Sequence, residues 1–291
     1  MCGCTGTGSP TVVIDAGNGD FSLGWQGIQP EIAKSTRICT YDRAGYGWSD
    51  LSPNQRTAES FATELHTLLE NAGEQPPYVL VGQSLGGFTV RMFASQYPGE
   101  VSGMVLVDAG HEQQLERFPP EYPQINQQQI SYLGAMQFMS RFGILRLLGN
   151  ASGGADLAPP QVRKLPADIQ PVYLAMMSHS SYFDVTLAEL RALSETSQQV
   201  RTARRQFDFP LIVLTAENTP DPEAMQAIGM PADFDVTKIQ QTWRELQADL
   251  ATLSPRGEHF IVEGSGHAIE LDKPQAVIDA ILEVLVLARQ D

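Results

Sequence analysis

A serine flanked by glycines stands where a short apolar run meets a helical pattern. The stretch VLVGQSLGG covers residues 79–87, with Ser84 two residues from both Gly82 and Gly86. Glycines at these places permit a tight, strained turn that raises a serine hydroxyl above the end of a strand. The helix that follows points its amide groups at the same spot, which favours developing negative charge. The order strand, turn, helix predicts that Ser84 is a nucleophile.

A serine nucleophile needs a base, because its hydroxyl reacts poorly until a neighbour takes the proton. Among five histidines, His267 stands in FIVEGSGHAIELDKP, on a glycine-rich loop past the last strand candidate. Ligands of open α/β folds bind at that edge of the sheet. His66 falls in a helical pattern, His179 in an irregular region and His259 at a strand start, where structural roles are expected. His267 is therefore the predicted base.

A second glycine turn, in VVIDAGNGDFSLGW, follows the first strand candidate. Its glycines leave backbone amides exposed, so Asn18 or Gly19 could offer one N–H towards the serine while Leu85 offers the other. This pairing predicts an oxyanion hole built from the amide of Leu85 and that of either Asn18 or Gly19.

The elements that must position these residues alternate between short apolar runs and longer helical patterns. Such alternation is typical of a mainly parallel sheet covered on both faces. The strand candidates are residues 11–15, 37–41, 78–82, 103–108, 211–215 and 259–263. Helical periodicity appears at 57–71, 85–97, 236–253 and 274–288. These patterns predict an α/β fold class.

The region 111–205 breaks this rhythm with a proline cluster, a long apolar stretch and a glycine-rich turn. It is far longer than an ordinary connection between a helix and a strand, so it predicts an inserted helical cap. Residues 1–110 and 206–291 then form the core domain. Candidate pocket residues are Phe138 and Phe142 in the cap, and His111 just past a strand end.

Composition limits the class of protein. The 291 residues are 42% apolar and 18% charged, enough for a full core, and the net charge of −15 disfavours nucleic-acid and anionic-membrane partners. No signal peptide or membrane-spanning run is evident, so we expect a cytoplasmic protein with no membrane insertion. Cys2, Cys4 and Cys39 are too few and scattered for a disulfide scaffold, and the first two make half a metal site at best. We expect no metal and no cofactor.

Taken together, the motifs resemble those of the α/β-hydrolase family. The similarity runs from Thr11 to the end of the chain and rests on GQSLGG, DAGNGD, YDRAGYGWSD, VLVDAGHE and GSGHAIELDKP. It is closest to serine esterases and lipase-like members with a helical cap. The resemblance implies the α/β-hydrolase fold, the catalytic order Ser, Asp or Glu, His, and a mainly structural role for the motif at 42–47. It assigns Ser84 as nucleophile and His267 as base, with the amides of Asn18 and Leu85 as oxyanion hole.

The acid of the triad departs from the family pattern. Family members carry it after the penultimate strand in a pattern like G-x-x-D, but LIVLTAENTPDP has Ala216 for the glycine and Thr219 for the carboxylate. Asp221 lies two residues later, and Asp108 ends the previous strand. We rank Asp108 level with or slightly above Asp221, and Glu217 third.

The short N-terminus is a second departure. Family members carry a strand pair before the first glycine turn, whereas only ten residues precede Thr11. A six-stranded sheet would leave the strand at 37–41 as an open edge, which invites unwanted pairing. We expect either the N-terminal segment or a second copy, in a homodimer, to cover it.

The predicted reaction is hydrolysis of a small-molecule carboxylic ester through an acyl-enzyme on Ser84. Two alternatives stay open. A C–C bond hydrolase or a lactonase would use the same triad, and a non-catalytic binder would keep the scaffold without turnover.

Overall fold

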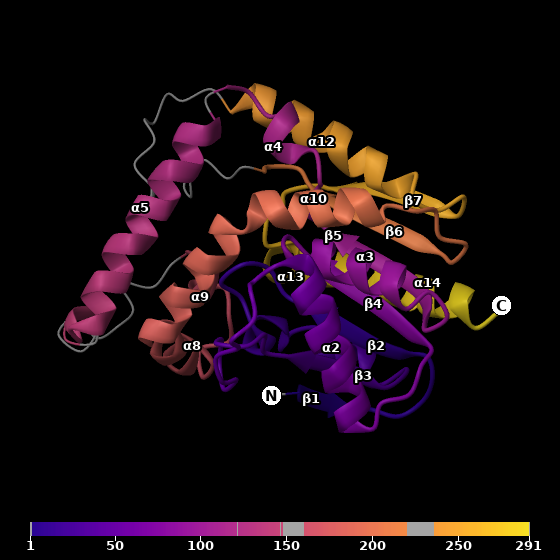
Figure 1. The fold of residues 1–291 in the computed structure, drawn as a ribbon. Coiled ribbons are helices and arrows are strands. Elements are labelled where there is room, and N and C mark those ends of the chain that lie inside the picture. Colours follow the sequence, from indigo (N-terminus) through magenta and orange to yellow (C-terminus); the bar gives the residue numbers. More distant parts are fainter. Residues whose placement is uncertain (1, 121, 146, 148–159, 220–235, 291) are drawn as a thin grey trace.

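A seven-stranded sheet forms the centre of the protein in a computed structural model that describes residues 2–120, 122–145, 147, 160–219 and 236–290 (Figure 1). The strand order is β1-β3-β2-β4-β5-β6-β7, and every neighbouring pair is parallel except β1 with β3. The strands are β1 (Cys2–Thr5), β2 (Thr11–Asp15), β3 (Ile38–Tyr41), β4 (Tyr78–Gln83), β5 (Val101–Val107), β6 (Leu211–Ala216) and β7 (Gly257–Val262). The predicted α/β fold class with a mainly parallel sheet is confirmed.

Helices cover both faces of this sheet (Figure 1). One face packs against α2 (Ala58–Ala72), α3 (Gly86–Gln96), α10 (Leu193–Ala203) and α12 (Thr237–Ala251). The other packs against η1 (Ser22–Trp25), α1 (Gln29–Ile32), α13 (Ile269–Asp272) and α14 (Pro274–Ala288). Each of the six predicted strands and four predicted helices is present, and each end lies within two residues of its predicted place.

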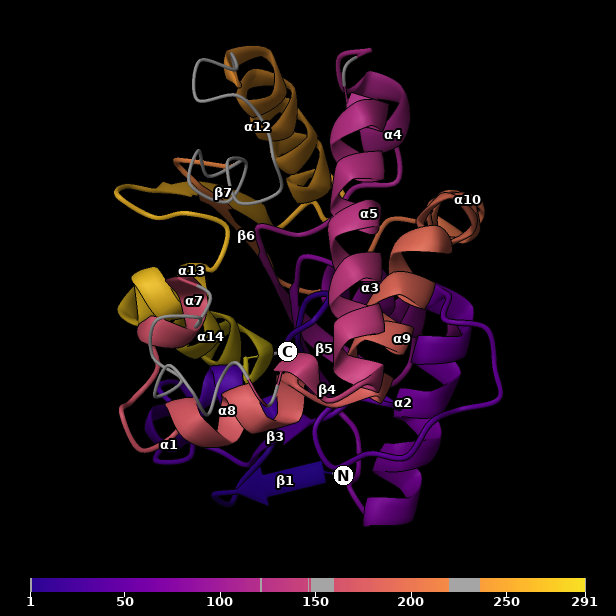
Figure 2. The same ribbon diagram turned by 90° about the vertical axis from the view of Figure 1, so that its left-hand side faces the viewer.

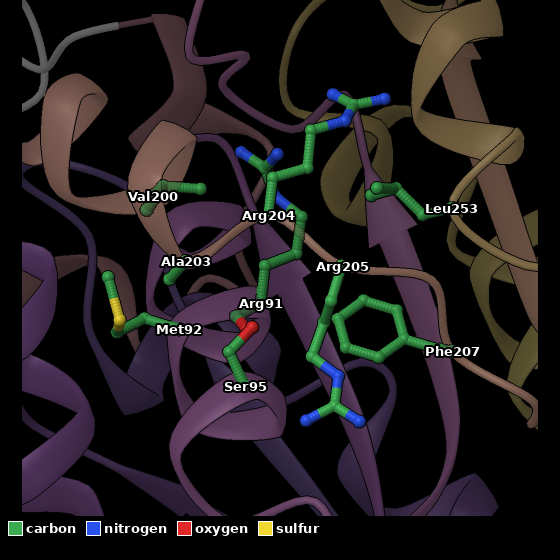
Figure 3. A pocket seen from close by; sticks show the side chains of 9 residues that line it. All are labelled: Arg91, Met92, Ser95, Val200, Ala203, Arg204, Arg205, Phe207 and Leu253. Atoms are coloured by element: carbon green, nitrogen blue, oxygen red, sulfur yellow. The ribbon is translucent and has the colours of Figure 1, made fainter.

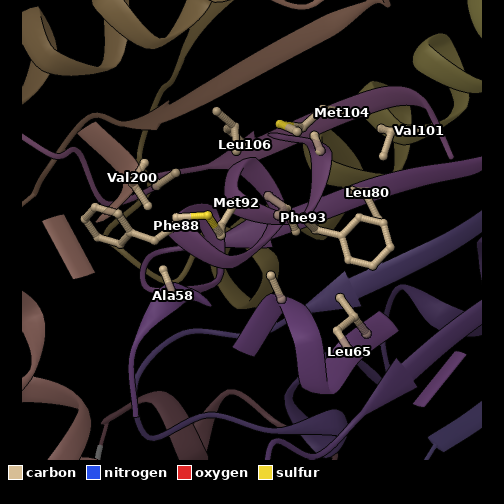
Figure 4. Packing of buried hydrophobic residues seen from close by; sticks show 14 of the residues in the cluster. Ala58, Leu65, Leu80, Phe88, Met92, Phe93, Val101, Met104, Leu106 and Val200 are labelled. Atoms are coloured by element: carbon tan, nitrogen blue, oxygen red, sulfur yellow. The ribbon is translucent and has the colours of Figure 1, made fainter. Parts of the chain in front are cut away.

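Alternation along the central strands builds two separate cores. In β4, Leu80 joins the cluster under α2 and α3 (Figure 4), and its neighbours Val79 and Val81 belong to the second cluster, which includes residues of α14. Successive side chains of a strand point to opposite faces, so a strand buried on both faces reads as a continuous apolar run. This burial holds the carboxyl ends of β4, β5 and β6 in fixed register at one edge of the sheet.

The N-terminal segment covers the edge of the sheet at β3, which would be open in a six-stranded sheet. β1 pairs antiparallel with β3, with Cys4 opposite Cys39, and a disulfide joins these two residues across the strands. The expectation that the N-terminal segment covers this edge is confirmed. The cysteine count predicted no disulfide scaffold, and this single bond was not predicted. The two cysteines are far apart in the sequence and meet only because β1 pairs with β3. The Cys2 sulfur lies 3.3 Å from that of Cys4, and burial raises the pKa of its thiol to about 11.

We expect loss of this disulfide to destabilise the protein. In a Cys2→Ser background, which prevents an alternative pair, Cys4→Ala should lower the free energy of unfolding by about 3 kcal/mol, because a loop of some 35 residues is no longer closed in the unfolded chain. Urea unfolding measures the change, and Cys2→Ser alone is the control, expected within about 0.5 kcal/mol of the wild type. Equal stability of the two variants would show that the bond does not constrain the chain.

We call residues 111–205, between β5 and β6, the helical insertion. The regular elements among its described residues are all helices. They are α4 (Gln114–Arg117), α5 (Tyr122–Arg141), α7 (Pro160–Arg163), α8 (Gln170–Met177), α9 (Ser180–Arg191) and α10. Figure 2 shows α5 and α9 running side by side, whereas α10 packs on α2 and α3. Its division from the core as a separate cap stays a prediction. In the described part of the chain, no helix combines the length and the apolar character needed to cross a bilayer.

Candidate functional site

The turn at Ser84 has the strained geometry that the glycine spacing predicts. Ser84 lies between β4 and α3 with a φ of 50°, in the left-handed region that non-glycine residues rarely adopt. A Cβ on Gly86 would stand 2.1 Å from the carbonyl oxygen of Asp15, and one on Gly82 would stand 2.6 Å from that of Gly86. Both positions therefore require glycine, and the serine is presented at the N-terminus of α3.

Asp108 adopts the same strained conformation at the end of the next strand. Its φ is 43°, its side chain is fully buried, and its backbone N–H donates to Leu214 on β6 at 2.7 Å. The carboxylate accepts four hydrogen bonds, two on each oxygen. On Oδ1 the donors are the amide of Ala216 at 3.0 Å and the indole N–H of Trp243 at 2.8 Å. On Oδ2 they are the hydroxyl of Thr219 at 2.8 Å and Nδ1 of His267 at 2.6 Å.

His267 lies between this carboxylate and the turn at Ser84, which we call the elbow. Its Nδ1 bonds Asp108, and its carbonyl oxygen accepts a hydrogen bond of 3.1 Å from the side chain of Gln83, the residue before Ser84. The histidine side chain is 42% exposed, whereas the aspartate is buried, so the imidazole lies between the acid and solvent. Among the described residues, the Ser84 hydroxyl makes no hydrogen bond. Such contacts between nucleophile and base are often loose without substrate.

Of the other two candidate acids, Glu217 makes no bond to His267 in the part of the chain that the structure describes. Asp221 lies outside the described residues. Glu217 accepts a hydrogen bond of 2.8 Å from the backbone N–H of Gly264, so it fastens the turn before the histidine. Thr219, which occupies the place of the family's acid, donates its hydroxyl to Asp108 instead. The geometry therefore favours Asp108.

The first glycine turn lies directly against the elbow. A Cβ on Gly17 would stand 3.1 Å from the Cβ of Ser84, which explains the glycine by close approach. In the described parts of the chain, the backbone amides of Asn18 and Leu85 have no hydrogen-bond partner. Two free amides, one on each turn next to the serine, are the arrangement expected of an oxyanion hole.

The buried Arg43 holds this glycine turn in place. Its guanidinium donates to the carbonyl oxygens of Ala16 and Gly17 and forms ion pairs with Asp15 at 2.7 Å and Glu189 at 3.0 Å. Burial alone would lower the pKa of Arg43, but Glu189 and Asp15 raise it well above its ordinary value. The motif at 42–47 is structural, as the resemblance implies, and part of what it supports is the turn beside Ser84.

Side chains from the helical insertion complete the support of the turn. Glu189 on α9 accepts a hydrogen bond of 2.8 Å from the side chain of Asn18, and Tyr182 on the same helix donates to the carbonyl of Gly19 at 3.0 Å. Tyr173 on α8 donates to Asp20 at 2.8 Å. Burial raises the pKa of Asp20 to about 6, against the lowering effect of the Tyr173 hydroxyl. The insertion is therefore fastened to the turn that carries the Asn18 amide.

His111 is not a pocket residue. Its side chain is fully buried, with Nε2 2.9 Å from Asp249 on α12 and Nδ1 accepting the backbone N–H of Gln113. Burial lowers the pKa of this histidine, although Glu112 and Asp249 act against that effect. Glu112 in turn pairs with Arg91 on α3. The prediction that His111 contacts substrate is wrong, because both of its nitrogens are used within a buried polar network.

Phe138 and Phe142 lie on the outside of α5. They are 61% and 69% exposed, and their rings contact each other at 4.8 Å between centroids. Their predicted contact with substrate stays a prediction.

A small hollow between α3 and α10 lies away from Ser84. It is lined by side chains that include Arg91, Ser95 and Phe207 (Figure 3). It lies along the C-terminal half of α3, whereas Ser84 precedes the N-terminus of that helix.

Sequence reasoning missed two donors to the acid, Thr219 and Trp243. Thr219 could have been found, because a hydroxyl stands where the family carries a carboxylate. No local signal marks Trp243, since its indole reaches Asp108 only through the packing of α12 beside β6.

Comparisons with known proteins agree with this architecture. A family model described as alpha/beta hydrolase fold matches residues 10–139. YqjL of Bacillus subtilis, an uncharacterized protein, is 38% identical over 103 residues, which make up 35% of this chain and 41% of that protein. The chain spans between 17% and 41% of the length of the curated relatives that it matches first.

Two solved structures show the same fold over nearly the whole chain. The epoxide hydrolase CorEH superposes with a TM-score of 0.68 at 18% identity, covering 98% of this chain and 94% of that one. A thermophilic esterase from Thermogutta terrifontis, with malate bound, superposes with a TM-score of 0.65 at 20% identity, covering 99% and 93%. The residues that match the family model include the turn at Ser84, and the chain as a whole has the α/β-hydrolase fold.

Proposed function

We propose that the protein is a serine hydrolase that cleaves carboxylic esters through an acyl-enzyme on Ser84. The observation that carries this proposal is the 2.6 Å bond between His267 Nδ1 and the buried Asp108, on loops that meet the strained turn of Ser84. That bond fixes the tautomer of the histidine and leaves its Nε2 to act as the base.

The reaction follows from these positions. Ser84 Oγ attacks the ester carbonyl while His267 Nε2 takes its proton, and the amides of Asn18 and Leu85 stabilise the oxyanion. The alcohol leaves with the proton from His267, and an acyl-enzyme remains. Water, activated by the same nitrogen, attacks the acyl group, releases the acid and returns the proton to Ser84. An aspartate at the position of Ser84 would favour an alkyl-enzyme route to epoxide opening, so the serine favours acyl transfer.

The test is a burst experiment with a p-nitrophenyl ester of a short fatty acid. We expect a rapid release of one nitrophenolate per active chain, followed by slower turnover, because a nitrophenyl ester acylates the serine faster than water removes the acyl group. A fluorophosphonate should block the burst and add its mass to the peptide that carries Ser84. As a control, Ser95→Ala on α3, the helix that follows Ser84, should label at the wild-type rate.

A panel of linear esters, lactones and C–C bond substrates then defines the substrate class. Preference for lactones or for C–C bonds would move the proposal to that alternative. A folded protein that neither labels nor turns over any of these compounds would contradict it and favour a non-catalytic binder.

A further inference from the structure

We propose that Trp243 is a positioning residue for the catalytic pair, in that its indole holds the Asp108 carboxylate in the orientation that His267 requires. This inference rests on the proposed function. The indole N–H donates to Oδ1 at 2.8 Å, while His267 bonds Oδ2 at 2.6 Å. The tryptophan is 6% exposed and the aspartate 0%, so neither bond is shared with bulk solvent.

The carboxylate depends on these donors because it is buried without a cation. Within the described residues, no lysine or arginine pairs with Asp108. A buried carboxylate is costly unless hydrogen bonds satisfy its oxygens, and it has room for about four. With Ala216 and Trp243 on Oδ1, and Thr219 and His267 on Oδ2, each oxygen is fixed. Loss of the indole donor would leave Oδ1 with one hydrogen bond, and the Asp108 carboxylate could then rotate about its Cβ–Cγ bond.

Helix α12 is built to deliver the indole at this point. Gln247, one turn after Trp243 and on the same face, donates to the carbonyl of Ala109 at 2.6 Å. Through these two side chains, α12 donates hydrogen bonds to Asp108 and Ala109, the two residues that directly follow β5. The indole ring also stands nearly upright against the imidazole of His267, with 6.4 Å between centroids and an interplanar angle of 69°. Trp243 thus contacts both members of the pair.

The first test is Trp243→Phe, which keeps an aromatic ring but removes the N–H. We expect kcat on the p-nitrophenyl ester to fall about tenfold, with KM changed less than about twofold, because the buried indole acts through Asp108. The acid limb of the kcat/KM profile should move to higher pH. The reason is that a carboxylate with fewer donors attracts the histidine proton more strongly.

Gln247→Met is the matched control, since it removes the neighbouring bond of α12 to Ala109 and leaves Asp108 untouched. It should lower thermal stability without moving the pH profile. Other titratable groups near the histidine stay the same in both variants: Glu217 and Asp272 bond the amides of Gly264 and Gly266, and burial raises the pKa of Glu270 well above its usual range. If Trp243→Phe lowers stability but leaves the acid limb in place, the role is structural only and the proposal is wrong.

A second readout needs no ester. The chain has three tryptophans, so indole N–H signals in a nitrogen-labelled sample are few, and Trp243→Phe identifies its own. We expect that signal to shift in Asp108→Asn and to follow the titration of His267, whereas the signal of the exposed Trp48 stays constant. An indole that responds in a protein without esterase activity would leave the positioning intact and reject the proposed function. An indole indifferent to both changes would overturn the positioning.

Discussion

Ser84→Ala is expected to lower kcat/KM on the p-nitrophenyl ester by about 10⁵-fold, because no acyl-enzyme can form without the hydroxyl. Residual turnover would come from the two free amides at Asn18 and Leu85, which still stabilise the oxyanion. Substrate binding and the folded structure should persist, since Ser84 is partly exposed and its hydroxyl has no partner among the described residues. Steady-state kinetics and a thermal melt measure both effects.

Strain at the elbow provides an independent check on the same residue. Ser84→Gly removes the hydroxyl and also the Cβ that makes a φ of 50° unfavourable. It should therefore be as inactive as the alanine variant but more stable than the wild type by about 1 kcal/mol. A gain in stability would show that the positive φ at this turn lowers the stability of the folded protein. Activity near the wild-type level in either variant would show that another group is the nucleophile.

The central strands β2 to β6 were predictable because they are buried on both faces. Such strands read as short apolar runs, and glycine, proline or a polar cluster marks where each ends. The order of strand, turn and helix around Ser84 is also local, so the elbow could be read directly from GQSLGG. His267 followed from its place after the last strand, since the carboxyl ends of parallel strands lie at one edge of the sheet.

The features that the sequence did not reveal depend on contacts between distant segments. β5 and β6 are neighbours, so their ends offer acids from two different loops, and only the packed structure shows Asp108 at His267. His111 follows Asp108 closely in sequence, yet its side chain is turned into the core by Asp249 on α12. The disulfide depends on an antiparallel strand of four residues, too short to be recognised from periodicity.

The cytoplasmic location and the homodimer stay predictions. The edge of the sheet at β3, where a second copy could have paired, is covered by β1 of the same chain. Disulfides persist mainly in oxidising compartments and are rare in the cytoplasm. The bond between Cys4 and Cys39 therefore does not favour the predicted cytoplasmic location.

Asp108→Asn is expected to lower kcat by about 10⁴-fold and to slow fluorophosphonate labelling of Ser84 to a similar degree. The amide oxygen of asparagine would still accept the N–H groups of Ala216 and Trp243 on the Oδ1 side. That choice turns the NH₂ group towards His267 Nδ1, which forces the proton onto Nε2. The histidine is then held in the tautomer that cannot accept the proton of Ser84.

The matched control is Asp221→Asn, with Glu217→Gln as the third arm. Both should label within about twofold of the wild type, because a carboxylate that does not bond the histidine cannot select its tautomer. Glu217→Gln can still accept the N–H of Gly264, so the turn before the histidine should survive. Rapid labelling of Asp108→Asn together with slow labelling of Asp221→Asn would transfer the role of the acid to the loop after β6. In that case the bond between Asp108 and His267 would be structural only.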